Sequence, residues 1–182
     1  MNRLHDAWKP LLLGAVLMLV LVGVAGAVPT QKPSALSSQR QLVVSAADFY
    51  PYSDDIDYYN NGNWLHSNAS FSTGYFLAPV DFPAPNWVTI DKFELFAYDN
   101  NDSGHILAYL YLSKPATGTQ QVIASIDTGY AFADSTVPRT WQTTTISPNV
   151  KNPANDLYVW LGISDDTSLD VYGVRIWYRV GK

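Results

Sequence analysis

Hydrophobic and polar residues alternate along most of the chain after residue 40. The clearest stretch runs from Trp87 to Ser113 and reads WVTIDKFELFAY, then a polar turn DNNDSG, then HILAYLYLS. Because strand side chains point alternately to opposite faces, this pattern predicts a long β-hairpin. In the register that fits, apolar side chains of both arms share one face, which belongs in a core. The pairs are Ala97 opposite Ile106, Leu95 opposite Ala108 and Phe93 opposite Leu110.

The other face of this predicted hairpin mixes aromatic and charged side chains, and it is the main candidate for function. It carries Lys92, Glu94, Phe96 and Tyr98 opposite Tyr111, Tyr109, Leu107 and His105. Three interpretations stay open. The rings could form a platform for sugars, they could form a contact between copies of the chain, or other segments could cover them as a second part of the core.

The remaining segments have the same strand character, and no convincing helical period is found after the first 27 residues. Strands are expected over 41–50, 71–80, 120–127, 140–146, 157–163 and 169–180, with a hairpin turn at Asn60-Asn61-Gly62-Asn63. The apolar run LYVWLGI from Leu157 to Ile163 indicates a central strand. We therefore predict an all-β fold, an antiparallel β-sandwich or jelly roll of about eight or nine strands.

The last expected strand divides its residues between two faces. Simple alternation places Tyr172, Val174, Ile176 and Tyr178 on one face, and Val171, Gly173, Arg175, Trp177 and Arg179 on the other. Two guanidinium groups then flank an indole. That arrangement favours cation–π stacking, and as a binding site Arg175 and Trp177 would suit an acidic sugar or a carboxylate.

The N-terminal residues have the features of an export signal rather than of the fold. Arg3 and Lys9 precede an uncharged apolar run, and Ala25-Gly26-Ala27 has the small residues of a cleavage site. We expect a signal peptide, helical in its apolar part, at 1–27, a flexible linker at 28–40 and a β-sandwich domain at 41–182. The alternative is an uncleaved segment, which would be the only contact with a membrane. The expected location is secreted, extracellular or at the cell surface.

Composition narrows the function. The chain has no cysteine, so it forms no disulfide and has neither a thiol nucleophile nor a thiolate metal site. Its formal net charge of −5 argues against nucleic acid, because a phosphate backbone requires a basic surface. The aspartates of the turn from Asp99 to Gly104, Asp99 and Asp102, are candidate ligands of a structural calcium ion; otherwise they are ordinary turn residues. No other cofactor is expected.

Catalysis has little support. The sequence contains no G-x-S-x-G, H-E-x-x-H or phosphate-loop motif. Glu94 is the only glutamate, and a glycan hydrolase would need it together with a second carboxyl group across a cleft. We therefore expect a protein that is not an enzyme, and we keep a hydrolase using Glu94 as an alternative.

Three stretches carry a resemblance: AYDNN at the end of one strand, AYLYL in the next, and VYGVRIWYRV near the C-terminus. With them, residues 41–180 resemble small secreted β-sandwich domains of bacteria and, more loosely, carbohydrate-binding modules and jelly-roll subunits of surface assemblies. The resemblance implies a fold and a compartment but no active residues. The resulting hypothesis is an exported, non-catalytic β-sandwich that acts by binding or assembly, with a glycan-binding module as the alternative.

The partners expected are therefore a glycan or further copies of the chain. The residues predicted to contact a ligand are Glu94, Phe96, Tyr98, Tyr109, Tyr111, Arg175 and Trp177.

Overall fold

A computed structural model describes residues 38–68, 72–83, 87–129, 137–147, 150–151, 155–164 and 168–180. The expected signal peptide at 1–27, and all but the last three residues of the expected linker, lie outside the described residues. In the part of the chain that is described, no helix is long and apolar enough to cross a membrane.

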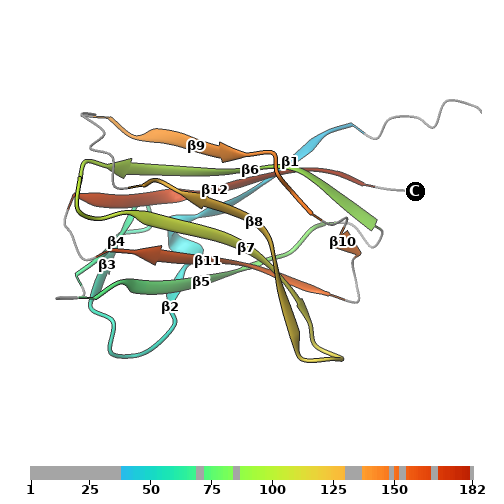
Figure 1. The fold of residues 1–182 in the computed structure, drawn as a ribbon, viewed down its shortest axis with the longest axis horizontal. Coiled ribbons are helices and arrows are strands. Elements are labelled where there is room, and N and C mark those ends of the chain that lie inside the picture. Colours follow the sequence, from blue (N-terminus) through green and yellow to red (C-terminus); the bar gives the residue numbers. More distant parts are fainter. Residues whose placement is uncertain are drawn as a thin grey trace, which may run out of the picture. The chain divides into compact units, whose positions relative to one another are not determined.

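Two antiparallel sheets make up the described structure, and they lie one above the other in Figure 1. The first sheet, of seven strands, has the order β10 (Val150–Lys151), β6 (Trp87–Asp99), β12 (Leu169–Val180), β4 (Leu65–Ser67) and β3 (Tyr58–Asn60), with β1 (Arg40–Ser45) also paired to β12 and β9 (Arg139–Thr143) to β6. The second sheet, of five strands, has the order β2 (Tyr50–Pro51), β5 (Gly74–Val80), β11 (Asp156–Ile163), β7 (Ile106–Lys114) and β8 (Thr119–Asp127).

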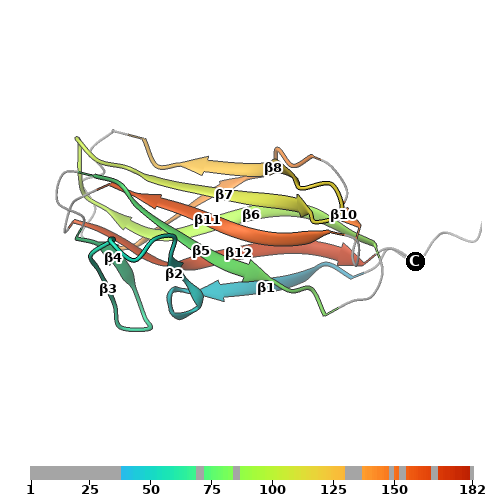
Figure 2. The same cartoon turned by 90° about the horizontal axis from the view of Figure 1, so that it is seen from below.

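The predicted fold class is confirmed, because the described secondary structure consists of antiparallel strands in two packed sheets, apart from one short 3₁₀ turn. Figure 2 looks onto the second sheet, where β11 lies between β5 and β7 as its apolar sequence predicts. The strands beyond the predicted eight or nine are short pieces of two or three residues. One predicted strand, 41–50, is divided into β1 and β2 by a 3₁₀ turn, η1 (Ala46–Asp48).

The core lies between the sheets and contains the apolar set predicted from alternation. Phe93, Leu95 and Ala97 of β6 are fully buried, and so are Ile106, Ala108 and Leu110 of β7. Full burial of one large apolar side chain stabilises a fold by about 1.5–3 kcal/mol. The size of this core explains how the fold is held together without any disulfide.

The predicted pairing of β6 with β7 is wrong. β6 pairs with β12 and β9 in the first sheet, whereas β7 pairs with β11 and β8 in the second. Residues 100–105 therefore lead from one sheet to the other instead of closing a hairpin. Both arms still turn their apolar faces to the same core, because the two sheets face each other across a distance of about 10 Å.

The two faces of β12 also differ from simple alternation at one point. A β-bulge between Val171 and Gly173 places Val171, predicted beside Arg175, in the core, while Tyr172 is only half-buried. Gly173 has φ of 147°, and a Cβ there would lie 2.5 Å from the carbonyl oxygen of Val44. Only glycine fits this close approach of β1 to β12, and the extra residue of the bulge shifts the alternation.

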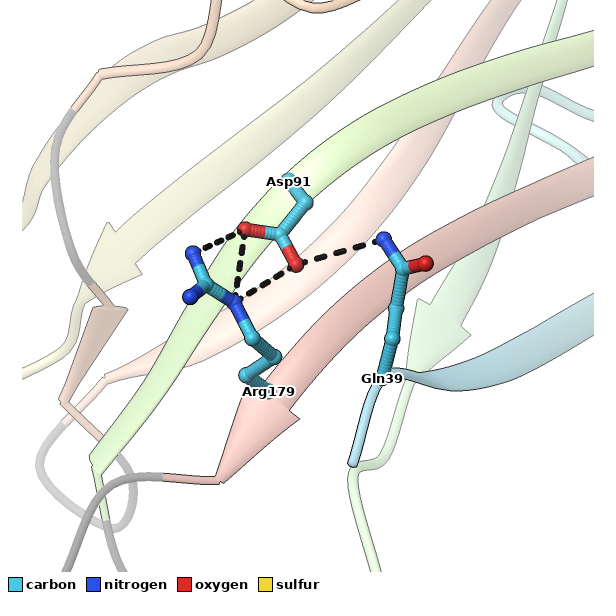
Figure 3. Close-up of polar contacts among 3 residues, drawn as sticks. All are labelled: Gln39, Asp91 and Arg179. Carbon is cyan, nitrogen blue, oxygen red and sulfur yellow. Dashed lines mark hydrogen bonds and ion pairs between the residues drawn. The ribbon is translucent and has the colours of Figure 1, made fainter. Parts of the chain in front are cut away.

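Polar side chains also connect β1 to its neighbours near the start of the domain. The guanidinium of Arg179 donates from Nε to both oxygens of Asp91, at 3.1 and 2.9 Å, and from Nη2 to Oδ1 at 2.6 Å. Gln39, directly before β1, donates to Asp91 Oδ2 at 3.4 Å, as Figure 3 shows. These contacts hold the point where the expected linker enters the domain.

Candidate functional site

The aromatic and charged face predicted for the hairpin is divided between two opposite surfaces. Tyr109 and Tyr111 point outward from the second sheet. Glu94, Phe96 and Tyr98 point outward from the first sheet, on the other side of the core. The predicted single surface is therefore wrong, because β6 and β7 belong to different sheets.

A groove crosses the outer face of the second sheet, and it has a volume of about 610 Å³. Six aromatic side chains dominate its lining. The lining residues are Tyr50, Tyr52, Tyr75, Leu77, Pro79, Tyr111, Gln120, Asp156, Leu157, Tyr158 and Trp160. Tyr52 and Tyr50 are 68% and 53% exposed, so apolar ring surface is open to solvent here.

The rings of the groove form two stacked pairs. Tyr111 and Tyr158 are nearly parallel, with centroids 5.2 Å apart and planes 7° apart. Tyr75 and Trp160 stack at 4.7 Å and 25°. Tyr109 meets the edge of Trp160 at 5.5 Å. Because each ring holds its neighbour in place, the platform exists before any ligand arrives, and little entropy is lost when one binds.

Strand register explains why these rings meet. Tyr158 lies directly opposite Tyr111, and Trp160 directly opposite Tyr109, so alternate residues of β11 and β7 face the same side. Gly162, the next such residue of β11, lies opposite Tyr75 of β5. A Cβ at Gly162 would lie 3.3 Å from the Tyr75 ring and 3.4 Å from the Trp160 ring. The glycine therefore leaves the space in which those two rings stack.

Phenol hydroxyl groups add polar contacts to the groove. Burial raises the pKa of Tyr158, and the neighbouring phenols of Tyr111 and Tyr52 raise it further. The Tyr158 hydroxyl therefore stays protonated well above neutral pH and can donate a hydrogen bond. Ring faces surrounded by hydroxyl groups match the faces of a pyranose, which has apolar C–H groups in its centre and hydroxyls at its rim.

The outer face of the first sheet contains a compact network centred on Glu94. Its carboxylate accepts a hydrogen bond from Trp177 Nε1 at 2.7 Å and lies 2.8 Å from Lys92 Nζ and 3.6 Å from Arg175. Burial by itself raises the pKa of Glu94, but the contacts with Lys92, Trp177 and Arg175 together lower it below its ordinary value. The guanidinium of Arg175 also lies over the ring of Phe96, at 4.6 Å from its centroid.

This network favours a structural role for Glu94. Its side chain is 8% exposed, and both of its oxygens are engaged by neighbouring groups. A general acid or nucleophile must reach its substrate, and the groove lies on the opposite sheet. Arg175 and Trp177 are likewise directed toward Glu94 rather than toward the groove.

A further cluster on the first sheet was not predicted. The rings of Tyr59, Trp64 and His66 contact one another, with centroids 4.8–5.8 Å apart, around the hairpin of β3 and β4. His66 Nδ1 lies 3.3 Å from Asp170 Oδ1. Burial raises the pKa of Asp170, and His66 offsets part of that effect. Tyr98 lies opposite Asp170 on β6. The rings mainly pack against each other, which stabilises the short hairpin.

The candidate calcium ligands lie at the end of β6 (Asp99) and in the connection from β6 to β7 (Asp102). The side chain of Asn101 accepts hydrogen bonds from the backbone of Ser103 and Gly104, at 2.6 and 2.9 Å, which is ordinary turn geometry. Asp99 is buried, and its Oδ2 has no hydrogen-bond partner among the described residues, a feature that favours a cation there; Asp102 is exposed. Among the described residues no group of three acidic, histidine or cysteine side chains is arranged around a common point, and the calcium site stays a prediction.

Most of the groove was missed at the level of the sequence. Tyr111 was among the predicted residues, but Tyr75, Tyr158 and Trp160 were not. In LYVWLGI the aromatic residues at 158 and 160 alternate with buried Leu157, Val159 and Leu161, so a period of two was present within what looks like a continuous apolar run. That signal indicates a strand with one buried face and one aromatic face.

Comparisons with known proteins concern the fold. No family model matches the sequence, and no curated protein matches it either. Among solved structures the chain is similar to the xylan-binding module CBM15, with 10% identity over 77% of this chain and 97% of that one, and a TM-score of 0.48. It is also similar to the C-terminal CBM6 of LamC, a laminarinase from Zobellia galactanivorans, with 17% identity over 75% and 98% of the two chains and a TM-score of 0.45.

Proposed function

We propose that this protein is a non-catalytic glycan-binding protein, and that the groove on the second sheet is its binding surface. The observation that carries the proposal is the concentration of six aromatic side chains along one open groove of about 610 Å³. A volume of this size accommodates a ligand of several rings. The stacked pairs supply flat apolar surfaces, and the phenol hydroxyls and Gln120 supply hydrogen bonds around them.

Glycan binding explains the exposed rings better than assembly or catalysis does. Large exposed apolar patches mark binding sites, and the groove is concave, which suits a chain-like ligand better than a flat partner surface. The second candidate, a hydrolase using Glu94, would require that carboxyl group to face a cleft, whereas it is buried in a network on the other sheet.

The expected signal peptide supports a location outside the cell, where polysaccharides are found. The absence of cysteine is compatible with that location, because the buried core stabilises the domain without disulfides.

Affinity electrophoresis tests the proposal directly. The full chain and its variants are run in gels that contain soluble arabinoxylan, mixed-linkage β-glucan or galactomannan, and retardation measures binding. Trp160→Ala removes a ring from the centre of the platform, and we expect the affinity to fall about thirtyfold, the loss typical of a central anchor residue. Trp87→Ala is the matched control, because Trp87 is 49% exposed at the start of β6 in the other sheet.

Two outcomes would refute the function. If wild-type protein migrates in every polysaccharide gel as it does in a gel without polysaccharide, the groove binds none of these glycans. Equal retardation of Trp160→Ala and wild type, with a folded variant by circular dichroism, would show that binding takes place elsewhere.

A further inference from the structure

We infer that the groove selects uncharged glycans and discriminates against chains that carry carboxylate or sulfate groups. The inference rests on the proposed function and names the class of ligand within it. Of the described residues that line the groove, none is lysine, arginine or histidine. The lining instead includes the carboxylate of Asp156, which is exposed at the start of β11.

Asp156 lies at one end of the groove, next to a second carboxylate. Beyond Pro79, Asp156 and Leu157 the groove adjoins a smaller hollow of about 170 Å³ that these three residues also line. Asp81 is part of that hollow. A glycan that extends past Pro79 therefore meets two carboxylates. Carboxylates accept hydrogen bonds from neutral sugar hydroxyls, but they repel acidic substituents.

At the opposite end of the groove the chain continues into an acidic segment, none of whose carboxylates is among the lining residues. The backbone N–H of Tyr52 donates to the carbonyl oxygen of Tyr75 at 2.8 Å, which places Tyr52 at the far end from Asp156. The exposed segment that follows Tyr52 contains Asp54, Asp55 and Asp57. A hydrogen bond from the Ser53 hydroxyl lowers the pKa of Asp55 below its ordinary value, so this carboxylate is ionised at neutral pH.

Three basic side chains, Lys92, Arg175 and Arg179, are paired on the other surface of the domain, whereas Lys114 is exposed at the end of β7 and is not among the residues that line the groove. Lys92 and Arg175 flank Glu94, and Arg179 binds Asp91, all on the outer face of the first sheet. An anionic chain in the groove would thus meet the carboxylate of Asp156, with no cation among the described residues that line the groove. Because the groove is open to solvent, this repulsion is partly screened, and it weakens as salt is added.

Matched pairs of polysaccharides with the same backbone test this inference. The pairs are hydroxyethyl cellulose with carboxymethyl cellulose, dextran with dextran sulfate, and laminarin with sulfated laminarin. In any pair that binds, we expect the neutral member to bind at least tenfold more tightly in 20 mM NaCl, and the difference to narrow in 500 mM NaCl. Equal or tighter binding of the anionic member at low salt overturns the inference and leaves the proposed function standing. If neither member of any pair binds, the inference is overturned; the proposed function fails as well only if the electrophoresis gels with arabinoxylan, mixed-linkage β-glucan and galactomannan also show no retardation.

One substitution tests whether the groove itself discriminates. Asp156→Asn removes one negative charge at almost constant size, and we expect affinity for the anionic member of the binding pair to rise about threefold at low salt. Gln142→Lys changes the net charge by the same amount at an exposed position of β9 in the other sheet, and it should leave that affinity unchanged. An equal rise in both variants would mean that overall charge discriminates instead of the groove, which also contradicts the inference.

Discussion

The network around Glu94 should contribute measurably to stability and not to glycan binding, and Glu94→Gln tests both statements. The substitution keeps the size of the side chain and an oxygen that can accept from Trp177 Nε1, but it removes the charge. Lys92, at 2.8 Å, and Arg175, at 3.6 Å, then lose their partner. The substitution therefore measures how much the negative charge contributes to the free energy of unfolding at a side chain that is 8% exposed.

The size of the stability loss depends on how well water can solvate Lys92 and Arg175 once the negative charge is gone. A hydrogen bond to a charged group contributes about 1.5–3 kcal/mol. The side chains of Lys92 and Arg175 are 27% and 33% exposed, so water replaces part of the lost interaction, and exposed pairs contribute about 1 kcal/mol or less. We expect the free energy of unfolding to fall by about 2 kcal/mol at pH 7. For a domain of this size that corresponds to about 6 °C in Tm.

The pH dependence gives the sharper test. The pKa of Glu94 in the folded protein is below the ordinary value of 4.5, so the carboxylate adds stability above pH 4.5 and this contribution is lost as the pH falls through the folded pKa. The difference between wild type and Glu94→Gln should stay constant from about pH 7 to pH 5 and shrink below 4.5. Urea unfolding followed by tryptophan fluorescence at several pH values measures it, with Asp102→Asn, in an exposed turn, as the control variant.

Two results would refute this reasoning. One is a Glu94→Gln variant as stable as wild type at pH 7, and the other is a difference that does not change with pH. The folded Glu94→Gln variant should bind glycan as tightly as wild type does. A loss of affinity would instead indicate that Glu94 contacts the ligand.

Three other predictions follow from the described contacts. Phe93→Ala should lower the free energy of unfolding by about 3–5 kcal/mol in urea titration, because this fully buried ring leaves a cavity; a loss below about 1 kcal/mol would contradict its place in the core. Gly173→Ala should destabilise the fold far more than Gly118→Ala, because a Cβ at 173 meets the carbonyl oxygen of Val44 at 2.5 Å while one at 118 meets nothing within 4 Å; equal melting temperatures of the two variants would argue against the close approach of β1. Glycan affinity should be constant from about pH 6 to pH 9, since the raised pKa of Tyr158 keeps its hydroxyl protonated; a decline in calorimetric titrations within that range would contradict the prediction, because a group with a lower pKa would then control binding.

The candidate site illustrates where reasoning from sequence stops. Tyr109 and Tyr111 were expected to contact a ligand together with Phe96 and Tyr98, and each of the four does point away from the core. The groove is completed instead by Tyr75 and Trp160, from strands that are distant in the chain. Which outward rings share a surface depends on which strands share a sheet, and that is decided by contacts between residues far apart in sequence.

The sequence by itself determined most strand segments, the inward faces of residues 93–97 and 106–110, and the all-β class, because alternation of side chains is a local property of an extended backbone. It did not determine strand pairing. The six residues from 100 to 105 are long enough either to close a hairpin or to cross the roughly 10 Å between two sheets, and both choices bury the same apolar residues. Only the tertiary structure selected the crossing, and with it the aromatic groove on one face of the sandwich and the Glu94 network on the other.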